Sequence, residues 1–168
     1  MLAMSILNYF AYGSNMSMRR LSRRLDWLQC LGRATLAGHE LRFHKVGADG
    51  SAKCNAYRVG GDALLHGVLY EIEVAGRVVL DRIEGVGKGY EVAMVEVRDS
   101  DGVQCEALTY IATHIDDSLQ PFDWYLHHVV TGAIELELPK THLAALKEIV
   151  SQPDLDRERA ARELAIYT

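Results

Sequence analysis

Apolar and alternating runs fill the first two thirds of the chain, whereas apolar residues at helical spacing dominate the last third. Two short helical patterns interrupt the early runs, over residues 16–25 and 74–83. A regular alternation of strand and helix is missing from the sequence, which argues against a dinucleotide-binding fold of parallel strands. The order of patterns favours an α+β fold whose sheet is mostly antiparallel and is strongly curved or closed into a barrel.

Turns rich in Gly, Asp and Ser divide the chain into short segments. The expected strands cover residues 6–12, 27–37, 40–44, 52–58, 64–72, 91–98 and 103–112. The turn at 60–62 predicts a hairpin between 52–58 and 64–72, and the turn at 99–102 predicts a second hairpin. Asn15 or Ser17 is placed to cap the first helix. Later helices are expected over 121–133, 139–150 and 153–164.

The composition is that of a soluble globular protein. Hydrophobic residues make up 49% and charged residues 24% of the 168 residues, which is enough apolar material for a core. We expect a single domain over residues 1–168, with residues 153–168 as a C-terminal helical tail. The net charge of −5 lacks the basic footprint of a nucleic-acid-binding protein. A solvated helix face is the first interpretation of the one basic cluster, with an anion-attracting patch as the alternative; its members are Arg19, Arg20, Arg23 and Arg24.

Cys30, Cys54 and Cys105 are widely spaced and form no CxxC pair. This argues against a zinc site or a disulfide framework and favours reduced, buried thiols in a reducing compartment, the cytoplasm. The stretch 1–7 is too short to export the chain or to span a bilayer. Met4 is an alternative start, which would leave residues 1–3 outside the fold.

Metal binding and nucleophilic catalysis find little support in the sequence. His127 and His128 are adjacent, so on a helix they diverge by about 100° and do not easily share a metal ion. The sequence contains no HExxH motif. Ser14 lacks the Gly-x-Ser-x-Gly elbow of a serine nucleophile, and Cys105 is expected in the core.

Two segments carry candidate chemistry. The first is the strand-to-helix turn at Gly13, Ser14 and Asn15, where backbone N–H groups can converge on an anion. An ordinary helix cap is the simpler interpretation of that turn. The second is Glu84, between an apolar helical pattern and a glycine-rich stretch. A carboxylate partly removed from water there suits proton transfer, although composition alone favours a solvated glutamate at a helix end.

The string YFAYGSNM at residues 9–16 closely resembles the signature loop of the γ-glutamylcyclotransferases, whose broader relatives are the avirulence-induced-gene-like proteins and the γ-glutamylamine cyclotransferases. Further likenesses are RATL at 33–36, LRF at 41–43, GVLY at 67–70, and Leu-Asp-x-x-Glu-Gly-Val at 80–86 followed by Tyr90. Tyr125 with the following TGA at 131–133 also fits. The similarity runs from about residue 6 to residue 149, and the tail 153–168 has no counterpart.

The resemblance implies a small mixed, mostly antiparallel β-barrel with flanking helices. It also implies a reaction without metal, nucleotide or other cofactor, in which the α-amine of a γ-glutamyl group attacks its own side-chain carbonyl and 5-oxoproline forms. Glu84 would be the general acid and base. The expected substrate-binding residues are Tyr12, Gly13, Ser14, Asn15 and Tyr125. The expected partner is a small γ-glutamyl compound, not a nucleic acid or a membrane, and the protein is expected as a monomer or homodimer.

Several alternatives stay open. A γ-glutamylamine cyclotransferase, or an enzyme that removes a γ-glutamyl protecting group, would use the same chemistry with a different pocket for the leaving group. We expect the segments 46–51 and 115–122 to decide that pocket. A non-catalytic module of the same fold would bind a small anionic ligand, although Glu84 argues against this alternative.

Overall fold

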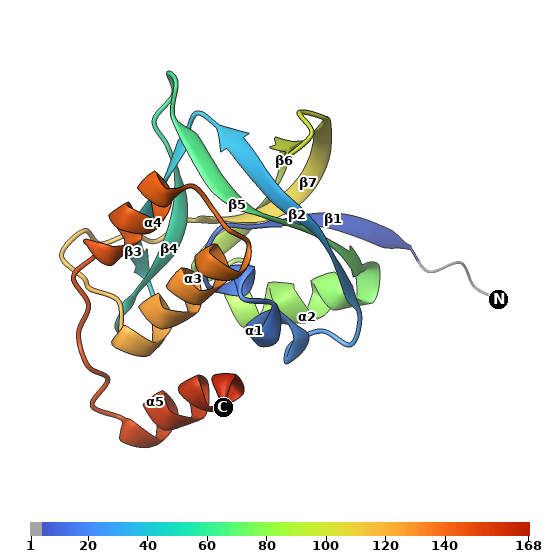
Figure 1. Ribbon diagram of the computed structural model, residues 1–168. Helices are drawn as coiled ribbons and strands as arrows, with labels where there is room; N and C mark the ends of the chain where they lie inside the picture. Colours follow the sequence, from blue (N-terminus) through green and yellow to red (C-terminus); the bar gives the residue numbers. More distant parts are fainter. Residues whose placement is uncertain (1–4) are drawn as a thin grey trace.

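A computed structural model describes residues 5–168 of the chain (Figure 1). A closed barrel forms its centre, with strands in the order β1–β5–β2–β6–β7. These strands are β1 (Ile6–Ala11), β2 (Leu28–Ala37), β5 (Leu64–Glu73), β6 (Tyr90–Asp99) and β7 (Gln104–Ala112). Four of the neighbouring pairs are antiparallel, and the parallel pair β1–β7 closes the barrel at Tyr9 and Leu108. The expected mixed, mostly antiparallel barrel is confirmed.

A separate two-stranded sheet holds β3 (His39–Val46) and β4 (Ala52–Arg58), which pair across the loop 47–51. The predicted hairpin between 52–58 and 64–72 is therefore wrong, because β5 pairs with β1 and β2 instead. The connection 59–63 does not reverse the chain onto β4. It is bound to the β2–β3 turn, where Gly38 N–H donates to Ala63 O and Gly38 O accepts from Val59 and Gly60. Both connections thus cross together from the barrel to the small sheet.

The first two helices flank the barrel near the end of β1. A 3-10 turn, η1 (Ser14–Met16), precedes α1 (Met18–Ser22), and the Ser17 side chain caps α1 by accepting from Arg20 N–H. α1 is shorter than the expected helix 16–25. α2 (Val74–Glu84) ends as expected at Gly85, whose φ of 70° and ψ of 49° are left-handed and favour glycine.

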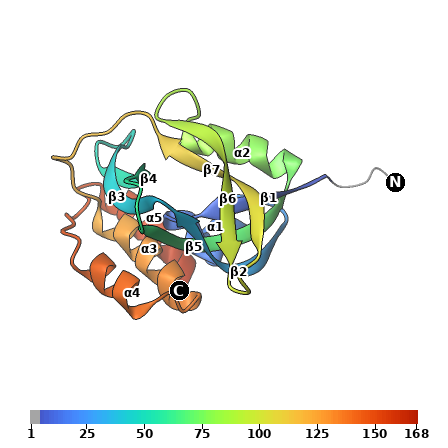
Figure 2. The same ribbon diagram turned by 90° about the horizontal axis from the view of Figure 1, so that it is seen from above.

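The last third of the chain is helical, as predicted, with α3 (Asp123–Glu135), α4 (Lys140–Lys147), α5 (Arg157–Leu164) and the 3-10 turn η2 (Ala165–Tyr167). α4 ends before Val150, which is exposed. α5 starts four residues later than Pro153, because Asp156 accepts from the Arg159 N–H and caps it there. α3 lies between α4 and α5 in Figure 1, and Figure 2 shows α3 and α4 on one flank of the barrel and α2 on another.

Fully buried side chains from the barrel strands form the core, among them Phe10, Val68, Tyr70 and Leu108. Within residues 5–168, no helix is long and apolar enough to cross a membrane. The interpretation of residues 1–3 as lying outside the fold concerns residues that the structure does not describe. All three cysteines are free; one is buried, as expected, whereas the other two are only partly buried and pack against the core.

Candidate active site

Two adjoining cavities open beside the end of β1. The inner cavity has a volume of about 30 Å³ and is lined by Tyr9, Tyr12, Gly13, Ser14, Asn15, Cys54, Glu84, Tyr90, Tyr110 and Tyr125. The outer cavity has a volume of about 610 Å³. Its wall shares Ser14, Glu84, Tyr90 and Tyr125 with the inner cavity. A ligand that spans both cavities would therefore pass the Glu84 carboxylate.

The Glu84 carboxylate is held in place by two neighbours. Its Oε1 accepts from Asn15 Nδ2 at 3.1 Å and from Arg24 Nη1 at 3.4 Å. Arg24 also donates to Asn15 Oδ1 at 3.1 Å, and Asn15 Nδ2 donates to the Tyr9 hydroxyl at 3.0 Å. The Glu84 side chain is 18% exposed. The signature turn and the end of α2 thus fix the orientation of one partly buried carboxylate.

The local sequence explains why Glu84 lies there. Glu84 is the last residue of α2, and the left-handed Gly85 ends the helix at that position. One turn earlier, Asp81 accepts from the Tyr110 hydroxyl at 2.7 Å, which ties α2 to β7. Tyr110 itself lines the inner cavity. The helix end is therefore anchored to the barrel on the side that carries the site.

Gly13 allows the signature turn to approach β4 closely. A Cβ at Gly13 would lie 2.9 Å from Cys54 Cβ, closer than side chains pack. Cys54 N–H donates to the Tyr125 hydroxyl at 3.0 Å, and the Tyr90 hydroxyl donates to Cys54 O at 2.5 Å. Burial raises the pKa of Cys54 to about 12. The thiol therefore stays protonated and is no nucleophile.

Five tyrosines surround the inner cavity, and burial raises the pKa of each above its ordinary value. They are Tyr9, Tyr12, Tyr90, Tyr110 and Tyr125. Because the hydroxyls stay protonated at neutral pH, they are neutral hydrogen-bonding groups. The Tyr12 hydroxyl donates to Tyr110 O, which ties the end of β1 to β7. The inner cavity is thus polar but carries a single titratable carboxylate, Glu84.

α3 packs against the signature turn through Gly132. A Cβ at Gly132 would lie 2.6 Å from the Met16 Cβ and from the Ser17 backbone nitrogen. The same helix carries Tyr125 and Trp124, which face the cavities rather than only the core. The close approach allowed by Gly132 therefore brings a tyrosine from the last third of the chain to the turn at its beginning.

The interpretation of the basic cluster as a solvated face is wrong for two of its four arginines. Arg19 and Arg23 are exposed, but Arg20 is buried and Arg24 is half-buried. Arg20 Nε donates to Ser14 Oγ at 3.2 Å, and Arg24 binds Glu84. The four-residue spacing of Arg20 and Arg24 brings both to the inward side of the turn after η1. The alternative of an anion-attracting patch describes these two better.

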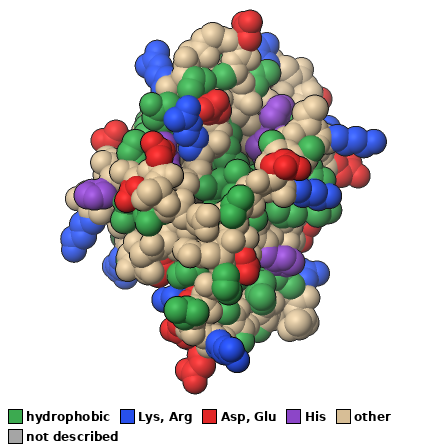
Figure 3. Space-filling model, turned by 90° about the vertical axis from the view of Figure 1, so that its left-hand side faces the viewer, with side chains coloured by type: hydrophobic (Ala, Val, Ile, Leu, Met, Phe, Trp, Pro, Cys, Tyr) green, Lys and Arg blue, Asp and Glu red, His purple; other side chains and the backbone are tan. Residues whose placement is uncertain are grey.

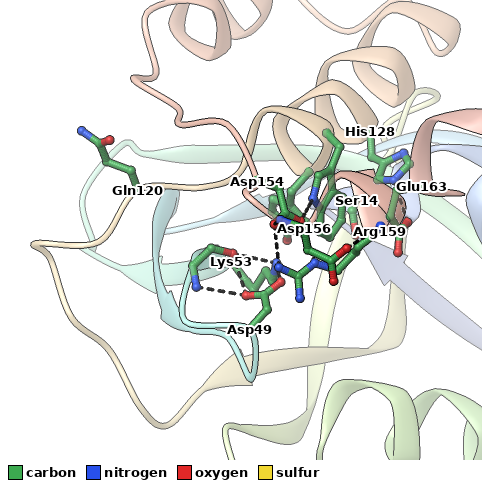
Figure 4. A network of polar contacts seen from close by, with 12 residues as sticks. Ser14, Asp49, Lys53, Gln120, His128, Asp154, Asp156, Arg159 and Glu163 are labelled. Atoms are coloured by element: carbon green, nitrogen blue, oxygen red, sulfur yellow. Dashed lines mark hydrogen bonds and ion pairs between the residues drawn. The ribbon is translucent and has the colours of Figure 1, made fainter. Parts of the chain in front are cut away.

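The C-terminal tail is not a solvated appendage, because its polar side chains bind residues behind the site. Glu163 pairs with Arg20 at 2.5 Å and accepts from His128 at 3.2 Å. His128 also contacts the Tyr167 hydroxyl at 2.6 Å. Figure 4 shows Glu163 beside His128 and Ser14. The tail thereby supports the arginine that holds the signature turn.

A second tail contact reaches the wall of the outer cavity. Asp154 accepts from Trp124 Nε1 at 2.8 Å and pairs with Arg159 at 2.6 Å. Figure 4 shows this pair near Lys53 and Asp49, which form their own ion pair at 2.8 Å. The Lys53 ammonium lies 4.7 Å from the centre of the Trp124 ring. The tail therefore positions an aromatic residue of the outer cavity.

All six residues predicted for the site come together around the inner cavity: Tyr12, Gly13, Ser14, Asn15, Glu84 and Tyr125. Of the two segments expected to form the leaving-group pocket, residues 46–49 line the outer cavity, but 115–122 do not. Sequence reasoning missed the site positions of Tyr9, Arg24, Lys45, Lys53, Cys54, Tyr90 and Tyr110. The alternation of β1 and the arginine spacing were signals for two of them; the others depend on which strands pair.

No group of three or more His, Cys, Asp or Glu side chains in the described part of the chain could hold a metal ion. His128 is buried against the tail. His127 and His128 both pack against the Tyr167 ring, with 5.0 Å and 5.4 Å between the ring centroids. The two adjacent histidines thus serve the contact between α3 and the tail.

Comparison with known proteins gives a family similarity over part of the chain and a fold for nearly all of it. The model of the AIG2-like family matches residues 64–146, a segment that includes Glu84 and Tyr125. A solved structure named gamma-glutamyl cyclotransferase has a TM-score of 0.82 at 24% identity and covers 95% of this chain and 99% of its own. An uncharacterized protein from Homo sapiens has the same TM-score and identity, over 97% of this chain and 99% of its own.

YkqA from Bacillus subtilis has a TM-score of 0.74 at 24% identity and covers 88% of this chain and 56% of its own. A search among curated proteins finds no match. The structural likenesses extend over the barrel and the helices around it, and the family match covers the segment that carries the glutamate. The chain is therefore similar to the AIG2-like family over residues 64–146 and has the fold of the structure named gamma-glutamyl cyclotransferase.

Proposed function

We propose that this protein is a γ-glutamyl cyclotransferase that releases 5-oxoproline from γ-glutamyl-amino acids, small molecules of a reducing, cytoplasmic compartment. The position of Glu84 carries the proposal. Its carboxylate lies where the two cavities meet and is bound by Asn15 of the signature turn at 3.1 Å. The fold shared with a structure named gamma-glutamyl cyclotransferase supports the same conclusion.

The two cavities suit the two parts of such a substrate. The inner cavity, at about 30 Å³, has room for a small polar group such as a carboxylate. It receives the head of the γ-glutamyl group, while the outer cavity receives the leaving group. Ser14 and Asn15 open the η1 turn, so their backbone N–H groups have no partner within it. These N–H groups are donors for the α-carboxylate or for the oxyanion of the reaction.

Glu84 moves the protons. Glu84 acts first as a general base and accepts a proton from the α-ammonium of the substrate. The freed amine nitrogen attacks the γ-carbonyl carbon, and a tetrahedral oxyanion forms. Glu84 then donates the proton to the leaving nitrogen as its bond to the carbonyl carbon breaks. The ring nitrogen gives up its second proton to the freed Glu84 carboxylate, which passes it to the departing amine or to water, so that 5-oxoproline and the amine leave and Glu84 is regenerated. Because the attack is intramolecular, orientation in the site can contribute up to about 7–11 kcal/mol.

The test is release of 5-oxoproline by the wild type and by Glu84→Gln, across γ-glutamyl-amino acids, γ-glutamyl-amines and glutathione. We expect wild-type release from the amino-acid compounds and a loss of about 100-fold or more in kcat for Glu84→Gln, with substrate binding retained. Glu91→Gln on the exposed side of β6 is the matched control and should keep full activity. Normal turnover by Glu84→Gln would exclude Glu84 from the mechanism. Binding without turnover by the wild type would favour a non-catalytic module.

A further inference from the structure

The outer cavity is strongly cationic in a protein that is acidic overall. Its wall carries six cationic side chains, Arg20, Arg24, Lys45, Lys53, Arg82 and Lys88, and two carboxylates, Asp49 and Glu84. The whole chain has a net charge of −5. On the outer face shown in Figure 3, Lys and Arg side chains are interspersed with Asp and Glu. The cavity wall therefore carries more positive than negative side chains, which favours an anionic ligand.

Most of these cations already have a partner or face water. Arg20 pairs with Glu163, Arg24 with Glu84, and Lys53 with Asp49. Arg82 and Lys88 are exposed. Lys45 differs from all of them. It is only 8% exposed, and within residues 5–168 its ammonium takes part in no ion pair or hydrogen bond.

The Lys45 side chain is buried along most of its length, while its ammonium faces the outer cavity with no anion from the described part of the chain beside it. Burial lowers the pKa of Lys45, against the opposing effect of Glu84 and Asp49. A cation–π contact stabilises the ammonium only in part; it lies 4.5 Å from the centre of the Tyr90 ring. An anionic group of a ligand would supply the missing partner.

The position of Lys45 relates it to the reacting end of a substrate. Tyr90, on which the ammonium rests, lines both cavities, as does Glu84. Gly89 makes the position possible, because a Cβ there would lie 2.9 Å from Lys45 Nζ. The ammonium therefore lies on the outer-cavity side of the junction, where the first atoms of a leaving group would emerge.

We infer that Lys45 binds a carboxylate of the leaving group, so that the outer cavity selects γ-glutamyl compounds whose leaving group is anionic over neutral or cationic amines. This inference rests on the proposed function of the same site. Lys45 is a specificity-determining residue in this assignment, and it takes no part in proton transfer. The surrounding cations add to the selection, because they repel an amine that carries a second positive charge.

The experiment compares γ-glutamylglycine with γ-glutamylglycinamide, two compounds that differ in one carboxylate. We expect the wild type to prefer the acid by about 10- to 100-fold in kcat/KM, as one charge-assisted contact allows. Lys45→Met should bring the two compounds to within about threefold by raising KM for the acid alone. Lys147→Met, on the exposed surface of α4, is the matched control and should keep the preference.

A second variant and a binding measurement test the same inference independently of Lys45→Met and of turnover. Gly89→Ala displaces the ammonium without removing its charge, so it should weaken the same preference. Calorimetric titration of Glu84→Gln with both compounds reads the preference without turnover. If the wild type releases no 5-oxoproline but the acid still binds more tightly through Lys45, the cyclotransferase proposal fails and the anion site stands. Equal affinity for the two compounds, or an unchanged preference in Lys45→Met, would overturn the inference.

Discussion

The inner and outer cavities share four lining residues, but the other side chains in their walls differ in kind. The inner one is enclosed by tyrosine hydroxyls, a glycine turn and one glutamate, and its groups are bound to one another from four strands and two helices. The outer one is enclosed by long charged side chains and the loop 46–49. Long side chains and loops change conformation more readily than packed rings do.

The difference separates the reaction from the choice of substrate. The inner cavity would hold the γ-glutamyl head, which is common to all substrates of this class, so its geometry must be fixed to small tolerances. The outer cavity would hold the leaving group, which varies, and its charge can change without disturbing Glu84. A comparison of variants in the two regions should therefore show losses in kcat for one and changes in relative KM for the other.

The largest effect after loss of Glu84 is expected from Gly13→Ala, which breaks the inner cavity. The new methyl group would lie 2.9 Å from Cys54 Cβ, an atom fixed to the backbone of β4. Overpacking of this kind costs about 1–3 kcal/mol of stability, and the displaced turn should lower kcat by at least about tenfold. Kinetics and thermal melting measure both. Gly76→Ala, whose methyl meets only the end of the flexible Leu25 side chain, is the control; equal losses in the two variants would contradict the prediction.

Arg24→Gln should have a smaller effect and sharpen the comparison. The variant removes the guanidinium that binds both Glu84 and Asn15, while the Asn15 contact to Glu84 remains. Loss of one of two positioning contacts is expected to lower kcat by about 10-fold, the equivalent of about 1.4 kcal/mol, with little change in leaving-group preference. The exposed neighbour Arg23→Gln controls for net charge. A change in preference between γ-glutamylglycine and its amide, at constant kcat, would place Arg24 in the outer region instead.

The smallest effect concerns the tail and appears in the pH dependence of stability. Burial acts to raise the pKa of Glu163, but His128 and Arg20 outweigh it and hold the pKa at about 2, below the ordinary 4.5. A lowered folded-state pKa stabilises the protein above the unfolded value, and the contribution is lost as pH falls from about 4.5 towards about 2.

Between about pH 5 and pH 3, the melting temperature of the wild type should therefore fall by more than that of Glu163→Gln. Each kcal/mol of unfolding free energy that the wild type loses corresponds to about 2–4 °C. The Arg20–Glu163 pair is partly exposed, at 10% and 26% of the side chains, so a shift at the low end is expected. Glu158→Gln, exposed on α5, should follow the wild type. Parallel pH profiles for wild type and Glu163→Gln would show that the tail contact contributes nothing.

Much of the barrel could be read from local patterns. The strands of residues 6–12, 27–37, 64–72, 91–98 and 103–112 all exist, because each alternates or is largely apolar, and the first, second and fourth of them end at a glycine or aspartate turn. The end of α2 was also predictable, since Gly85 is the residue that adopts the left-handed conformation there. Strand partners were less predictable. The glycines at 60 and 61 look like a hairpin, but hydrogen bonds to Gly38 direct the chain elsewhere.

The site residues also divide into those that local patterns predicted and those that depend on tertiary packing. The turn at 13–15 and Glu84 stood out as short motifs, and both line the inner cavity. Arg24 was interpreted first as part of a solvated helix face, and Lys45 did not stand out, because a charged residue on a short helix or strand is exposed in most proteins. The burial of each depends on what packs over it: the end of α2 at Glu84 for Arg24, and the segment at Gly89 for Lys45.

The sequence by itself determined the class of fold, the turn that meets the ligand-sized cavities and the glutamate beside it. These follow from apolar periodicity and from the conformations open to glycine, both of which act over a few neighbouring residues. Only the tertiary structure decided which strands pair, that the tail binds Arg20, and that Lys45 is buried beside Tyr90 without an anion. Those features depend on contacts between residues far apart in the chain. A local sequence pattern does not show which charged side chains another element will cover and remove from water.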